Sequence, residues 1–171
     1  IRTSILRLPF DSDYVSGAEA SAGFLALVPP VLTSMGFKLV RRSAFSERML
    51  AFPVEDRFGE DMVVAAAVIL ASPAVALVRQ PLYHYVHSDS LRTTSFSLKK
   101  ARDLLADMDQ IAGYAEEAAR ITNLDAFRSE MLFSVTRQIT WSEAYRTPEA
   151  QELLDKVRDL RPPAKPVVEG V

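Results

Sequence analysis

A run of ten apolar residues directly after two acidic residues is the feature that most constrains the fold of this chain. The run covers residues 62–71 and follows Gly59, Glu60 and Asp61. Its alanine content and its acidic start favour a helix that is buried on all sides, while its β-branched residues leave a strand as the alternative. An element that is apolar all round must be covered, so we expect the rest of the chain to pack around it.

The two carboxylates at the start of this run have a chemical as well as a structural interpretation. Gly59 can adopt backbone angles that are closed to other residues, which suits a sharp entry into a helix. Carboxylates in a first helical turn face the positive end of the peptide dipoles, which favours the ionised form that a general base needs. The alternative is that Glu60 and Asp61 only cap a helix.

Composition excludes several classes of protein. The 171 residues and 49% hydrophobic content suit one domain, or a domain with an appendage. A net charge of −2 argues against a nucleic-acid binder. The chain has no cysteine, which excludes a disulfide framework and cysteine-based chemistry and fits a reducing cytosol. No run approaches the about 18 apolar residues of a membrane span, and no signal sequence opens the chain.

Asp11, Ser12 and Asp13 form a pair of aspartates one residue apart, after a short extended segment at residues 1–9. Such a pair can hold a divalent cation against a diphosphate, because hard cations prefer oxygen ligands. The same residues also favour a polar turn, because their side chains bond the local backbone. We interpret them as a turn and keep the metal role as the alternative.

A cluster of three cations follows the first predicted helices. Residues 18–27 are predicted to be a helix and residues 31–35 a helical turn closed at Gly36. Residues 37–40 alternate as a strand, and residues 43–49 form a short helix with Ser43 as its N-cap. The cations are Lys38, Arg41 and Arg42. They could attract a phosphate, or they could form a solvated edge.

Two short strands and a polar loop follow the apolar run. The strands are predicted at residues 74–78, as a buried strand, and at residues 82–86. The loop at residues 87–95 is rich in hydroxyl groups and contains His87 and Arg92. Such groups bind phosphate oxygens or coordinate a metal, although loops of this composition are often only solvated connections.

The order of these features resembles the second half of inverting family 2 glycosyltransferases with the GT-A fold. The resemblance is strongest to bacterial enzymes that decorate cell-wall and capsular polymers, and it covers about Phe37 to Ser95. The residues that carry it, in chain order, are Lys38-Leu39-Val40-Arg41-Arg42, Phe52-Pro53, Gly59-Glu60-Asp61, Pro81-Leu82-Tyr83-His84-Tyr85 and the polar loop.

The resemblance implies a fold and a set of roles. The fold would be α/β, with a partial GT-A sheet forming the acceptor-side half of the domain in residues 1–96. Asp61 would be the base that deprotonates the acceptor hydroxyl, and Glu60 would help to orient the acceptor. His87, Arg92 and Ser95 would contact the diphosphate of a nucleotide-sugar donor, or its Mn²⁺ or Mg²⁺ ion.

The same resemblance implies the acceptor and the place of action. The acceptor would be a hydroxyl of a polysaccharide or polyol-phosphate, and the enzyme would work in the cytoplasm or at the inner face of the membrane. Only 36 residues precede Phe37, whereas the family's nucleotide-binding half needs about a hundred. We therefore expect this chain to be a piece of a longer protein that lacks the donor-binding half and does not catalyse transfer alone.

The last part of the chain is predicted to be a helical appendage over residues 97–160, followed by a disordered tail at residues 161–171. Its helices are expected at residues 97–121, at 124–145 with Asn123 as N-cap, and at 147–160 with Thr147 before Pro148. Trp141 and Tyr145 lie one turn apart and could stack on a sugar ring. Aromatic pairs at that spacing, however, are usually part of a core.

Two functional hypotheses follow from the sequence. The first is the acceptor side of a glycosyltransferase with Asp61 as base. The second is a non-catalytic module whose helices mediate oligomerisation or docking, with a degenerate transferase-like segment. Neither hypothesis involves nucleic acid or a transmembrane segment.

Overall fold

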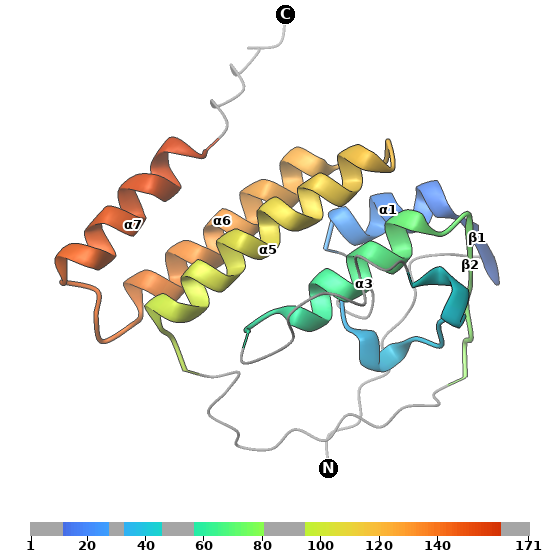
Figure 1. The fold of residues 1–171 in the computed structure, drawn as a ribbon, viewed down its shortest axis with the longest axis horizontal. Helices are drawn as coiled ribbons and strands as arrows, with labels where there is room; N and C mark the ends of the chain where they lie inside the picture. The colour runs from blue at the N-terminus through green and yellow to red at the C-terminus, as the bar shows by residue number, and fades with distance from the viewer. Residues whose placement is uncertain (1–11, 28–32, 46–56, 81–94, 162–171) are drawn as a thin grey trace, which may run out of the picture.

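The computed structural model describes residues 12–27, 33–45, 57–80 and 95–161. In this part the chain is mostly helical and has one small sheet, which confirms the predicted mixture of helices and strands at that coarse level (Figure 1). The elements are, in order, β1 (Tyr14–Ser16), α1 (Gly17–Leu25), the 3₁₀ turns η2 (Met35–Phe37) and η3 (Arg42–Ala44), α3 (Glu60–Ala71), β2 (Ala74–Ala76), α5 (Leu98–Glu117), α6 (Leu124–Thr140) and α7 (Pro148–Asp159).

Helix α3 is the buried helix that the apolar run predicts. Its N-cap is Gly59, in the left-handed region with φ of 95°, and its first turn carries Glu60 and Asp61. Val63 and every residue from 65 to 70 are buried. The C-cap of the helix is Ser72, whose hydroxyl donates to the Val68 carbonyl at 2.7 Å.

The sheet consists of two antiparallel strands, with Val15 opposite Val75. The prediction of a buried strand at residues 74–78 is wrong in two respects, because β2 is shorter and both of its alanines are exposed. Within the described residues β2 pairs only with β1, so its other edge forms no hydrogen bonds with a described strand. β1 leads directly into α1, where the Ser16 hydroxyl accepts from the Glu19 amide at 3.2 Å and completes a capping box.

The segment after α1 differs most from its prediction. Residues 37–40 do not form a strand, because the chain turns here: the Ser34 hydroxyl accepts from Gly36 N, and Lys38 N donates to the Met35 carbonyl. Leu39 is 99% exposed while Val40 is partly buried against the core, so the segment does not bury its apolar side chains as the predicted strand would. Ser43 lies inside η3 instead of capping a helix, and Arg41 takes the N-cap position.

The helical part agrees closely with its prediction. Ser97 caps α5 by accepting from Lys100 N at 3.2 Å, and Thr147 caps α7 by accepting from Ala150 N at 3.3 Å. Asn123 precedes α6 but makes no side-chain cap; its amide Nδ2 instead donates to the Ala22 carbonyl at 3.0 Å. Helix α6 ends at Thr140, earlier than the predicted residue 145.

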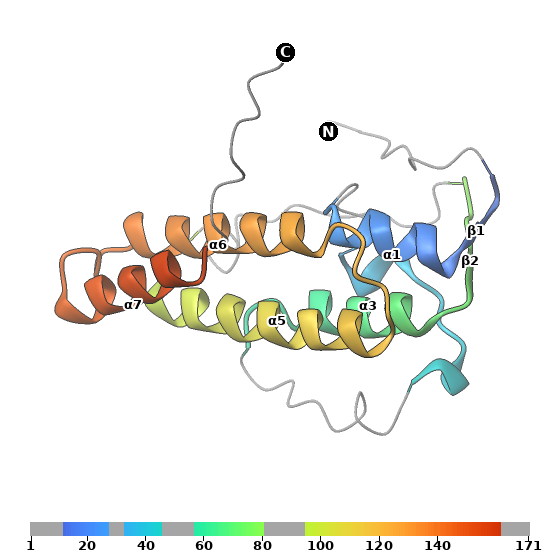
Figure 2. The ribbon, with the colours of Figure 1, turned by 90° about the horizontal axis from the view of Figure 1, so that it is seen from above.

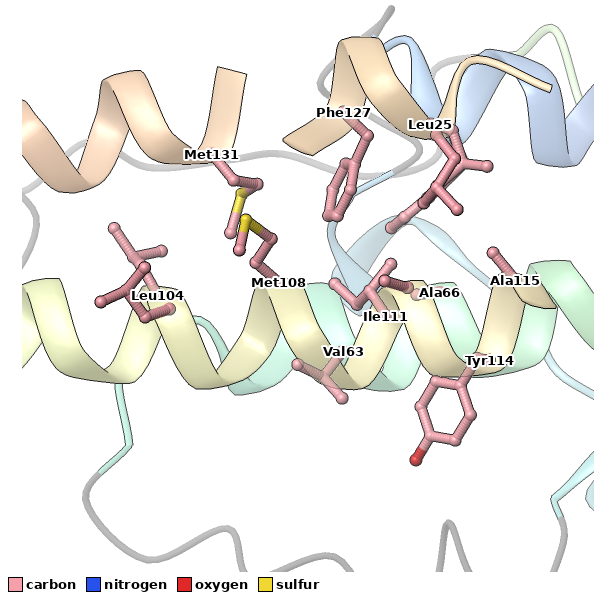
Figure 3. Close-up of a cluster of buried hydrophobic side chains, with 14 of the residues drawn as sticks. Leu25, Val63, Ala66, Leu104, Met108, Ile111, Tyr114, Ala115, Phe127 and Met131 are labelled. Carbon is pink, nitrogen blue, oxygen red and sulfur yellow. The ribbon is translucent and has the colours of Figure 1, made fainter. Parts of the chain in front are cut away.

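The helices form two layers around one core. Figure 2 shows α1 and α6 in one layer and α3 and α5 in the other, with α7 beside the far end of α6. Side chains from four helices meet between the layers, as Figure 3 shows for Leu25, Ala66, Ile111 and Phe127. Phe127 is fully buried, and burial of a side chain of this size contributes about 1.5–3 kcal/mol.

Several predictions concern residues whose structure is not described. They are the extended segment at residues 1–9, Asp11, the turn at 31–32, the helix at 46–49, the strand at 82–86 and the tail beyond 161. Within the described residues, no helix is both long enough and apolar enough to cross a membrane. The division into residues 1–96 and 97–160 stays a prediction.

Candidate functional site

The candidate base, Asp61, lies in the first turn of α3 with its side chain exposed to solvent. The Ser34 hydroxyl, 27 residues earlier in the chain, donates to Asp61 Oδ2 at 3.0 Å. Glu60 precedes it and is half-buried. The structure therefore places both predicted carboxylates at one helix start, with Asp61 the more accessible of the two.

Lys38 is the cation that lies near this helix start. Its ammonium group donates to the Ser34 carbonyl, which belongs to the same residue that contacts Asp61. Burial lowers the pKa of Lys38 to about 8, and attraction to the Asp61 carboxylate offsets part of that effect. Arg41 and Arg42 are exposed at η3. Among the three predicted phosphate contacts, Lys38 is therefore linked to Asp61 through Ser34.

Two carboxylates of α5 hold the chain segment that enters α3. The Phe58 amide donates to Asp103 Oδ2 at 3.0 Å, and Arg57 Nη2 lies 2.5 Å from Asp107 Oδ1. Asp103 also accepts from Lys99 Nζ at 2.9 Å. The position of Glu60 and Asp61 is therefore set by a helix that begins almost forty residues later in the chain.

Asp107 is the most deeply buried of these groups, with a side chain that is 0% exposed. Burial raises its pKa to about 6, the Arg57 guanidinium opposes this rise, and the neighbouring carboxylates of Asp103 and Glu60 add to it. Gly59 packs directly on this carboxyl, and a Cβ atom at position 59 would collide with Asp107 Oδ2. Glycine is therefore required at position 59 by its positive φ and by this close contact.

Arg57, Asp103 and Asp107 were missed by the sequence-based reasoning. One signal pointed to Asp107: it lies three residues after Leu104 and four before Ile111, both buried, so it is a charge on the apolar face of its helix. A charged residue in such a position needs a partner. The identity of that partner, Arg57, is not readable from the chain because 50 residues separate the two.

The predicted donor loop is described only at its end. His87 and Arg92 lie outside the described residues. Ser95 is described, and both its carbonyl and its hydroxyl accept hydrogen bonds from Lys100 Nζ, at 2.7 and 2.9 Å. The same ammonium group lies 4.8 Å from the ring centroid of Phe58. Lys100 therefore links Ser95 to the segment that enters α3.

In the described part of the chain, no group of three or more His, Cys, Asp and Glu side chains is arranged to hold the cation that the resemblance implies. Asp13 pairs with Arg79 at 2.7 Å, and Ser12 Oγ accepts from Tyr14 N at 3.1 Å, as in a polar turn.

Comparisons with known proteins do not place the chain in a family. No family model matches it, and no curated protein or solved structure matches it either.

Proposed function

We propose that this chain forms the acceptor side of an inverting glycosyltransferase in which Asp61 is the general base. The observation that carries the proposal is the hydrogen bond from the Ser34 hydroxyl to Asp61 Oδ2 at 3.0 Å. An alcohol O–H thus donates to an exposed carboxylate at a helix start, which is the arrangement that an acceptor hydroxyl needs before it loses its proton.

The reaction would proceed by a single displacement. Asp61 takes the proton of the acceptor hydroxyl while the acceptor oxygen forms a bond to the anomeric carbon of a nucleotide sugar. The bond from that carbon to the diphosphate oxygen breaks on the opposite face, the electron pair leaves with the nucleoside diphosphate, and the configuration inverts. General-base assistance of this kind contributes about 10²- to 10⁴-fold to a rate.

The surroundings of Asp61 support a fixed position for the base. Asp103 and Asp107 of α5 hold Phe58 and Arg57, so α3 starts at a defined place. Lys38 supplies positive charge on the same side as Ser34. Catalysis by a base depends on such positioning, because a shift of about 1 Å can cost about a hundredfold in rate.

The test is Asp61→Asn in the protein that carries this chain, assayed for transfer of radiolabelled sugar from UDP-glucose, UDP-N-acetylglucosamine and GDP-mannose. We expect transfer to fall by at least about a hundredfold, with donor binding unchanged in calorimetric titration. Asp125→Asn, an exposed acidic residue in the first turn of α6, is the matched control. Transfer by Asp61→Asn at the rate of the control would remove Asp61 from the mechanism.

A further inference from the structure

A depression of about 440 Å³ lies where the start of α5 meets the turn after α6. It is lined by Ser95, Phe96 and Ser97 on one side and by Trp141, Ser142 and Glu143 on the other. Its volume is within the range of small-molecule sites in proteins, about 300–1,000 Å³. Residues with aromatic, hydroxyl and carboxylate side chains therefore line the same space.

The two rings are held in place although they are not part of the core. Trp141 is 61% exposed and Tyr145 is 41% exposed, so of the two roles considered for this pair, the core role does not apply. Its ring meets that of Phe96 edge to face, with centroids 5.0 Å apart and an angle of 71° between the planes. The Arg137 guanidinium lies 4.6 Å from the indole centroid. An exposed ring fixed by two neighbours is pre-organised, so a ligand that contacts it loses little affinity to ordering.

The polar groups supply both donors and acceptors at the rim. The hydroxyls of Ser95 and Ser97 accept bonds from Lys100 Nζ and Lys100 N, and each hydroxyl also carries a proton that it can donate. The exposed carboxylate of Glu143 is an acceptor. A ligand with many hydroxyl groups could therefore satisfy both sides of the rim.

We infer that this depression binds a neutral oligosaccharide. Pyranose rings have a face of C–H groups with a partial positive charge, which suits the negative face of an aromatic ring, and hydroxyl groups at the edge, which suit the serines and Glu143. The negative charge of Glu143 and the positive charge of Arg137 over Trp141 lie at the same depression, so there is no single dominant charge to attract an acidic ligand. The ligand that fits this composition is an uncharged polyhydroxylated chain.

A series of contacts links the rim of the depression to the start of α3, the helix that carries the candidate base. Lys100 joins Ser95 at the rim to Phe58, next to Gly59 at the start of α3. Along α5 the distance from Ser97 to Asp103 is about 9 Å, at 1.5 Å per residue. An oligosaccharide in the depression would extend toward Asp61 as an acceptor. This placement, but not the binding itself, rests on the proposed function.

The chain contains a single tryptophan, so Trp141 reports on this site without labelling. The 171-residue chain is titrated with chitohexaose, cellohexaose and maltohexaose, with hexagalacturonate as the acidic comparator. Emission of Trp141 and the indole N–H cross-peak in ¹H–¹⁵N spectra are recorded. We expect a saturable change with at least one neutral hexamer and none with hexagalacturonate.

Three variants test the assignment. Phe96→Ala and Glu143→Ala should each weaken the apparent affinity by about three- to tenfold, the loss expected for one ring contact or one hydrogen bond. Phe133→Ala is the matched control, because Phe133 is an exposed ring (55%) on α6 that does not line the depression, and it should bind as the parent does. Circular dichroism verifies that the variants remain folded.

The outcomes separate this inference from the proposed function. Absence of a saturable change with all three neutral hexamers, or equal binding by Phe96→Ala, Glu143→Ala and the parent, would overturn the inference even if Asp61→Asn loses transfer. Oligosaccharide binding together with full transfer by Asp61→Asn would overturn the proposed base and leave the inference standing. A third outcome would also overturn the inference. If Trp141 emission changes with protein concentration and not with oligosaccharide concentration, and sedimentation shows that the chain associates over the same range, the depression is a self-association surface.

Discussion

The pH dependence of stability should report the buried Asp107 carboxyl directly. Burial raises the pKa of this group to about 6, from an ordinary value of 3.8. A folded-state pKa above the unfolded value means that the folded chain binds the proton more tightly. The contribution to stability is therefore complete below about pH 4 and disappears as the pH rises through about 6.

The size of the effect follows from the two pKa values. Between pH 8 and pH 5, a group with a pKa of about 6 when folded and 3.8 when unfolded adds about 1.4 kcal/mol to the free energy of unfolding. Asp107→Asn removes the titrating proton and keeps the shape of the side chain. The variant should therefore lack this increment, whatever the substitution does to stability at any single pH.

The assay is urea unfolding of the parent and of Asp107→Asn at pH 5 and pH 8, followed by circular dichroism. Comparing this pH difference between the parent and the variant cancels the contribution of every titrating group that the two proteins share. Asp155→Asn, on the exposed side of α7, is the matched control and should keep the increment of the parent. Equal pH differences in the parent and in Asp107→Asn, within about 0.5 kcal/mol, would refute the reasoning.

The remaining predictions concern backbone positions. Gly59→Ala should lower the free energy of unfolding by at least about 1–2 kcal/mol, because φ is 95° and the new Cβ would collide with Asp107. In the same urea assay Gly113→Ala, where an added Cβ meets nothing, should be neutral or stabilising by up to about 1 kcal/mol, and equal stability of the two variants would contradict the packing argument. Asn123→Ala should be less stable than Asn123→Gly by about 1 kcal/mol, since glycine accepts the φ of 69° that alanine resists; the reverse order would contradict it.

Features that depend on neighbouring residues were predictable from the sequence. The apolar run correctly predicted α3, because ten consecutive apolar residues are enough to indicate a helix that is buried on all sides. Thr147 was correctly placed at a helix start, because a cap acts on an amide only three residues away. The prediction of a strand at residues 37–40 was wrong, because an alternating pattern indicates which side chains a strand would bury but not whether a partner strand is present.

Features that depend on distant residues were not predictable. The contact between Phe58 and Asp103 spans 45 residues, and no local pattern indicates which helix will receive the start of α3. The exposure of Trp141 was not decided by the sequence, which left both a core pair and a sugar-stacking pair open. A spacing of four residues puts two rings on one face only within a helix, and α6 ends at Thr140, before both rings.

The two carboxylates of α5 impose a register on any sequence that keeps this arrangement. Asp103 and Asp107 are one helical turn apart and hold adjacent residues, Phe58 and Arg57. A single residue inserted between them would rotate the second by about 100° around the helix axis and move it off the start of α3. Insertions and deletions in related sequences should therefore be absent from residues 103–107 of α5 and should occur instead in the turn at residues 118–123, which lies beyond them.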